Sequence, residues 1–119
     1  MSMKVEILNE IAVAILNQDE KIYDIQDVLD FMADAHYSGC TAMVLDKGCL
    51  DDKFFDLKTG FAGEVLQKFS NYDMKIAIIG DFSSYPSQSL QDFIYECNKG
   101  NRVYFKATVE DGLKALAGS

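Results

Sequence analysis

Apolar and polar positions in the first part of the chain predict two paired strands. In residues 4–8 apolar and charged side chains alternate, as expected of a half-exposed edge strand. Residues 11–16 are apolar throughout, so this strand is expected to lie deeper in the sheet. Asn9 and Glu10 separate the two runs and fit the turn of an antiparallel hairpin. The apolar positions of the first strand are Val5 and Ile7, and its charged positions are Lys4 and Glu6.

The rest of the chain alternates between helical spacing and short apolar runs. The runs predict strands over residues 41–45, 74–79 and 102–106. We therefore expect residues 1–119 to form one α/β domain of order ββαβαβαβα, with a mixed, mostly parallel sheet of about five strands and helices packed on it. The helices are expected to begin at Asp24, at Asp51 or Asp52, after the loop of residues 82–87, and at Thr108.

Composition argues against several classes of function. Hydrophobic residues make up 49% of the 119 residues, which is enough for a packed core. The net charge of −8, without a basic stripe, argues against a nucleic-acid partner. The longest apolar run is too short for membrane insertion. The start of the chain does not resemble a signal peptide, and we expect Met3 to be the native start, with Met1 and Ser2 added before it.

The cysteines Cys40, Cys49 and Cys97 are an odd number without tight spacing. They indicate reduced thiols in a cytoplasmic protein instead of a disulfide framework. His36 precedes Cys40 by four residues, but two such residues do not make a zinc site, and a Cys–His nucleophile needs an orienting group. We therefore expect no metal, no cofactor and no catalytic residues. An enzyme, such as a hydrolase that uses Cys40 or Cys49, is the less favoured interpretation.

Residues 54–66 combine helical spacing with two glycines, Gly60 and Gly63. Each glycine costs about 1 kcal/mol relative to alanine in a helix interior. One interpretation is that Lys58, Thr59, Gly60 and Gly63 form a surface for a protein partner or an anion, because first-turn N–H groups attract anions. The other interpretation is that the glycines make room for tight packing of three aromatic side chains on the sheet. These are Phe54, Phe55 and Phe61.

A second candidate site lies at the carboxyl ends of the predicted parallel strands, where open α/β sheets bind ligands. Its residues resemble the phosphoacceptor Asp, the hydroxyl and the Lys of a receiver domain, although the acidic pair that would hold Mg²⁺ is missing after the first strand. Such a site would take a small ligand or a phosphoryl group. In the loop of residues 82–89, Ser87 or Ser89 is expected to cap the following helix. The candidate residues are Asp46, Asp81, Ser83, Ser84 and Lys106.

The order of elements resembles the STAS domain (sulfate transporter and anti-sigma factor antagonist). Residues 55–61, Phe-Asp-Leu-Lys-Thr-Gly-Phe, lie where STAS proteins carry Asp-Ser-Ser/Thr-Gly-Leu, at the start of the helix after the third strand. The tail, through residues 79–81, 102–105 and 110–116, is similar to the SpoIIAA-like group. Nearly the whole chain is similar to a small bacterial family of unknown function, numbered 4180 among such domains, above all in the Phe-Asp-Leu-Lys-Thr-Gly segment and in residues 93–100.

The resemblance implies a non-enzymatic regulatory module that recognises a protein partner. STAS antagonists are switched by phosphorylation of the first Ser of that motif. Counting back from Gly60, this position is Lys58, and Leu57 stands in place of the Asp. A lysine cannot accept the phosphoryl group, so the resemblance does not carry the switch to this chain unless Thr59 serves instead. The first strand could also pair with a second copy as a homodimer, but its charged side chains are typical of edge protection.

Overall fold

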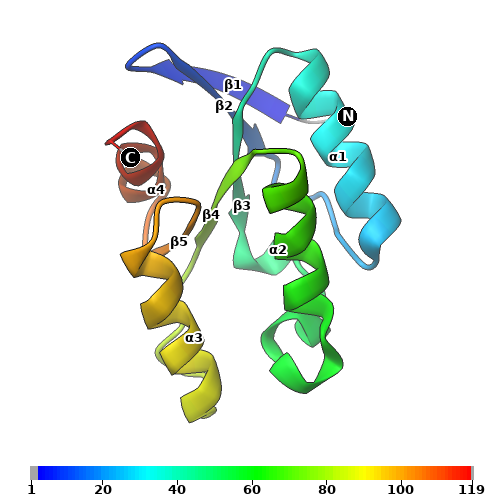
Figure 1. The fold of residues 1–119 in the computed structure, drawn as a ribbon, viewed down its shortest axis with the longest axis vertical. Coiled ribbons are helices and arrows are strands. Elements are labelled where there is room, and N and C mark those ends of the chain that lie inside the picture. Colours follow the sequence, from blue (N-terminus) through cyan, green and yellow to red (C-terminus); the bar gives the residue numbers. More distant parts are fainter. Residues whose placement is uncertain (1–2, 119) are drawn as a thin grey trace.

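Five strands form one sheet in the order β1-β2-β3-β4-β5 (Figure 1). The computed structural model describes residues 3–118, so the expectation about Met1 and Ser2 lies outside the described residues. β1 pairs with β2 antiparallel, and the remaining neighbours pair in parallel, which confirms the predicted mixed sheet. The strands are β1 (Met3–Leu8), β2 (Ile11–Leu16), β3 (Ala42–Asp46), β4 (Lys75–Ile79) and β5 (Val103–Lys106).

Helices cover the two faces of the sheet unequally. α1, α2 and α3 connect consecutive parallel strands and lie on one face, whereas α4 follows β5 and lies on the other (Figure 1). Crossovers between parallel strands are right-handed as a rule, and all three here step the same way along the sheet, so the three connecting helices are expected to share a face. A larger apolar core therefore forms under these three helices and a smaller one under α4. The helices are α1 (Ile25–Tyr37), α2 (Phe61–Asn71), α3 (Gln88–Lys99) and α4 (Val109–Gly118).

Capping side chains confirm three of the predicted helix starts. Each accepts a hydrogen bond from the backbone N–H three residues further on, which satisfies a donor that the helix leaves free. The predicted end of α1 is confirmed too, because Gly39 follows the helix with a left-handed φ of +84°. The caps are Asp24 for α1, Ser87 for α3 and Thr108 for α4, with distances of 2.9, 3.2 and 3.1 Å.

The hairpin of β1 and β2 is confirmed, but the alternation in β1 does not mark a buried side. Asn9 and Glu10 have φ of +49° and +69°, as a two-residue type I′ turn requires. The side chains of Val5 and Ile7 are 44% and 71% exposed. The cause is the connection, since a crossover helix covers the strands that it joins, and β1 is joined to β2 by a turn alone.

The prediction of a helix that begins at Asp51 or Asp52 is wrong for the first half of that segment. Three 3₁₀ turns occupy most of residues 47–59, and α2 begins only at Phe61. An aspartate opens each turn, and its carboxylate accepts a hydrogen bond from the N–H two residues further on. Such local bonds compete with the helical pattern of backbone hydrogen bonds. The three aspartates are Asp46, Asp51 and Asp56, and the turns are Lys47–Cys49, Asp52–Phe55 and Leu57–Thr59.

Candidate functional site

The aspartates at the carboxyl ends of β3 and β4 are occupied in shaping turns. The carboxylate of Asp46 accepts a hydrogen bond from the N–H of Gly48 at 2.8 Å. The carboxylate of Asp81 accepts two, from the N–H of Ser83 at 2.9 Å and from its hydroxyl at 2.6 Å. These two bonds stabilise the charged form and so lower the pKa of Asp81. Both side chains remain at least partly exposed at this edge of the sheet.

Lys47, which sequence reasoning missed, crosses from the end of β3 to the end of β4. Its ammonium donates a hydrogen bond to the carbonyl oxygen of Asp81 at 2.7 Å. Its aliphatic stem passes over Gly80, where an added Cβ would lie 2.7 Å from the Lys47 Cδ atom. The ammonium also lies 5.1 Å from the centroid of the Tyr85 ring, which is a cation–π distance. The only signal in the sequence is that Lys47 directly follows a strand-end aspartate.

A cleft of about 640 Å³ opens between the 3₁₀ turns and the loop from β4 to α3. We call it the carboxyl-edge cleft. Tyr85 stacks on buried Phe55, with ring centroids 5.0 Å apart and ring planes 17° apart. This stacking, together with the contact to Lys47, fixes one wall of the cleft. The lining includes Phe55, Leu57, Lys58, Tyr85, Ser87 and Ser89.

The first candidate surface borders this cleft. Lys58 lines it, and Lys58, Thr59, Gly60 and Gly63 are all exposed. The hydroxyl of Thr59 is within hydrogen-bond distance of the Lys53 carbonyl oxygen at 2.7 Å and accepts from the N–H of Phe61 at 3.2 Å. Thr59 therefore fixes the start of α2 and occupies one of the first-turn N–H groups that an anion would use.

The two glycines of this surface have different roles. Gly60 has a φ of +77°, a left-handed conformation that side chains rarely adopt, so the turn before α2 requires it. Gly63 lies in the first turn of α2, and a Cβ added there would meet nothing within 4 Å. Tight packing of the aromatic side chains therefore does not explain Gly63, although Phe54, Phe55 and Phe61 are buried as that interpretation expected.

The second candidate site is only partly brought together. Asp46, Ile79 and Lys106 lie side by side across three strands, so about 10 Å separates the backbones of Asp46 and Lys106. Asp81 and Ser83 are joined by their hydrogen bonds, and Ser84 is exposed beside them. None of the ion pairs between described residues involves Lys106. The lysine that contacts Asp81 is Lys47, through the Asp81 carbonyl oxygen.

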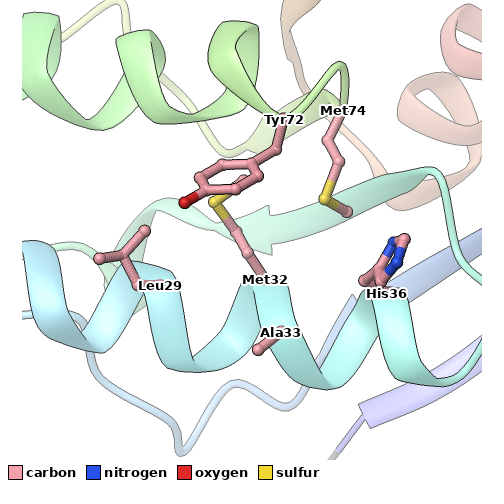
Figure 2. Close-up of a pocket in the computed structure, with 6 residues that line it drawn as sticks. All are labelled: Leu29, Met32, Ala33, His36, Tyr72 and Met74. Carbon is pink, nitrogen blue, oxygen red and sulfur yellow. The ribbon is translucent and has the colours of Figure 1, made fainter.

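A second cavity, of about 380 Å³, lies between α1 and the connection from α2 to β4. Figure 2 shows the apolar side chains of Leu29, Met32 and Met74 along it, with the Tyr72 phenol and the His36 imidazole toward opposite ends. His36 and Tyr72 are exposed, whereas both methionines are 4% exposed. The cavity can therefore accept an apolar group whose polar end meets one of these two rings.

The thiols lack the features of reactive cysteines. Cys40 and Cys49 are 2% and 0% exposed, and burial raises the pKa of both thiols. Burial raises the pKa of Cys97 as well. Within residues 3–118 no group of three or more His, Cys, Asp or Glu side chains is placed to hold a metal ion. In the same part of the chain, no helix has both the length and the apolar character needed to cross a bilayer.

The fold and its edge cleft define a class, the α/β proteins with a mixed five-stranded sheet and a single antiparallel hairpin at one edge. The chain belongs to the family described as Domain of unknown function (DUF4180), whose model matches residues 8–116. That match confirms the family similarity expected from the sequence. A search of curated proteins and a search of solved structures each gave no significant match.

Proposed function

We propose that this chain is a non-enzymatic regulatory module that binds a protein partner through Lys58, Thr59, Gly60, Gly63 and the carboxyl-edge cleft. The observation that carries the proposal is the exposed Lys58 at the border of a cleft of about 640 Å³. A preformed hollow with aromatic walls suits an apolar side chain of a partner, and a cation at its border suits a neighbouring carboxylate or carbonyl oxygen.

Gly63 supports the same surface. Neither its backbone angle nor a close neighbour requires glycine there, and alanine would favour the helix by about 1 kcal/mol in a helix interior. A glycine that the fold does not need is explained if a partner approaches the exposed backbone of the first turn of α2. A side chain at this position would hold that partner away from Lys58 and from the cleft beside it.

The element order adds a family-level argument for a regulatory role. The observed order ββαβαβαβα, with Thr59 and Gly60 before α2, is the pattern on which the resemblance to STAS domains rests. STAS antagonists act by contact with a protein partner. Leu57 and Lys58 stand where the Asp and the phosphoacceptor Ser would be, so contact without the phosphorylation switch is the expected mode. Thr59 is an unsuitable substitute, because its hydroxyl already holds the start of α2.

Site-specific photo-crosslinking tests the partner surface directly. A photoreactive amino acid is placed at Lys58 and, as a matched control, at Lys99, an exposed lysine at the end of α3. We expect a discrete adduct with a cellular protein from position 58 and not from position 99. The adduct should diminish when Gly63→Ala is added, since the methyl group keeps the partner away from α2. Identical adducts from both positions, or no adduct from position 58, would reject this surface.

The second candidate function is a phosphoacceptor or small-ligand domain at Asp46, Asp81, Ser83, Ser84 and Lys106. Its supporting observation is the alignment of Asp46 with Ile79 and Lys106 at the edge where parallel sheets bind ligands. Incubation with acetyl phosphate and Mg²⁺, followed by intact-mass measurement, distinguishes a phosphoacceptor domain from the partner-binding module. This function predicts one added phosphoryl group that is lost in Asp46→Asn. An unchanged mass would exclude phosphoacceptance.

A further inference from the structure

Among residues 3–118, the outer edge of β1 offers an unpaired row of backbone groups. In this part of the chain β1 is the first strand in the sheet order and pairs only with β2. An open edge is a template for pairing with another strand unless side chains prevent it. We propose that β1 forms the interface of a homodimer, in which the β1 strands of two copies run antiparallel with Val5 opposite Val5 of the second copy. This inference stands apart from the proposed partner surface, which lies at the carboxyl edge.

The hairpin turn determines which backbone groups face outward. A two-residue turn closes with a hydrogen bond between its flanking residues, here Leu8 and Ile11. Bonded and non-bonded positions alternate in an antiparallel pair, so the backbone groups of Lys4 and Glu6 face β2. Those of Met3, Val5 and Ile7 therefore face outward. A two-fold dimer that joins outward-facing groups must place an odd-numbered residue opposite an odd-numbered residue. Registers centred on Met3 or Ile7 would pair little of the strand, so registers centred on residues 4, 5 or 6 are left.

The charges of β1 select one of these three registers. A dimer centred on residue 4 places Lys4 opposite Lys4 of the second copy, and one centred on residue 6 places Glu6 opposite Glu6. Only the register centred on Val5 places Lys4 opposite Glu6, and two-fold symmetry makes this pair occur twice. Opposite charges directly across strands are favourable, and like charges are unfavourable. The edge residues therefore exclude the wrong registers and permit this one.

The other face of β1 agrees with this register. Val5 meets Val5 of the second copy, and Ile7 meets Met3, so every cross-strand pair on that face is apolar. Ile7 is 71% exposed and Val5 44% exposed in the single chain, which is apolar surface that the pairing would cover. Lys4 and Glu6 already form an exposed ion pair within the chain, at 3.1 Å, and both are available to exchange partners across the two-fold axis.

Charge reversal tests the register through oligomeric mass. Sedimentation velocity on the full chain, over a range of concentrations, should show wild type approaching twice 13.3 kDa. Lys4→Glu alone and Glu6→Lys alone should each weaken dimerisation about tenfold or more, because two symmetric pairs become like-charged. An equimolar mixture of the two variants should restore the dimer, since each then meets its opposite. Lys99→Glu, which breaks the exposed ion pair with Glu96 elsewhere, is the matched control and should dimerise like wild type.

Amide hydrogen exchange at each residue locates the interface. The N–H groups of Val5 and Ile7 should become protected as the concentration rises, whereas those of Lys4 and Glu6 face β2 and should not change. A wild type that stays monomeric up to millimolar concentration overturns the proposal. A dimer that the single charge variants do not weaken, or that their mixture does not restore, overturns the register and with it the β1 interface.

Discussion

Two helix glycines, the exposed Gly63 in α2 and the buried Gly112 in α4, should respond differently to substitution by alanine. The free energy of unfolding should rise at the first position and fall at the second. At Gly63 the added methyl group meets nothing within 4 Å. The change removes backbone freedom from the unfolded chain and adds helix propensity. In a first turn these two effects together should stabilise the folded protein by about 0.5–1 kcal/mol. For a domain of this size such a change raises the Tm by roughly 2–5 °C.

At Gly112 the same methyl group has no room. Its Cβ would lie 2.8 Å from the Ile79 Cδ1 atom and 3.2 Å from the Ala77 Cβ atom, whereas carbon atoms prefer about 3.5–4.0 Å. Ala77 has no rotamer with which to yield, and Ile79 is 6% exposed. Overpacking of this kind costs about 1–3 kcal/mol, which exceeds the gain of about 1 kcal/mol in helix propensity. Gly112→Ala should therefore destabilise by about 1 kcal/mol.

Urea denaturation monitored by circular dichroism measures both changes, with an unchanged m-value as the check on two-state behaviour. A double-mutant cycle with Ile79→Val sharpens the test, because valine lacks the Cδ1 atom that clashes. Gly112→Ala should cost less in the Ile79→Val background than in wild type. If Gly112→Ala stabilised the protein as much as Gly63→Ala, α4 would not approach β4 as closely as described, and the steric argument would be refuted.

Three further changes probe local features. Glu10→Gly should stabilise by about 0.5–1 kcal/mol in urea denaturation, because the residue has a φ of +69°; a loss of stability would contradict the type I′ turn. Thr59→Val should destabilise by about 1–2 kcal/mol, because the N–H of Phe61 loses its acceptor; no change would mean that solvent replaces the cap. Ser83→Ala should raise the pKa of Asp81 toward its ordinary value of 3.8, as followed by NMR. The lowered pKa of Asp81 stabilises the fold above about pH 3.8, and this stabilisation is lost as the pH falls through the native pKa. The free energy of unfolding of Ser83→Ala should therefore depend less on pH in that range.

The sheet could be predicted from the sequence because its signals are local. Continuous apolar runs marked β2 and β4 as inner strands, and capping residues such as Asp24 and Ser87 marked helix starts. The region between β3 and α2 could not be predicted as it folds. Phe54, Leu57 and Phe61 keep a helical spacing, yet aspartates at five-residue intervals tie the backbone into separate 3₁₀ turns. Periodicity does not reveal that competition, because all of these apolar side chains are covered in either case.

The candidate site was predicted only at the level of its place in the fold. Strand ends indicated the carboxyl edge, and the glycine-bearing segment indicated Lys58, which does line a cleft there. The role of Lys47 could not be predicted, since it depends on the passage of its stem over Gly80 and on the stacking of Tyr85 on Phe55. Both arise from contacts between segments more than 25 residues apart in the sequence.

Within the described part of the chain α4 is the one helix on the second face of the sheet, and this has a consequence for biosynthesis. Val13, Val44, Ala77 and Tyr104 are covered on that face by α4, whose Leu116 is 0% exposed. A chain grows from its N-terminus, so this apolar face stays open to water and to neighbouring nascent chains until the last of these elements leaves the ribosome. A chain that lacks only α4 keeps every strand but leaves these four apolar side chains without their cover. The ten residues of α4 therefore decide whether this face of the sheet is exposed.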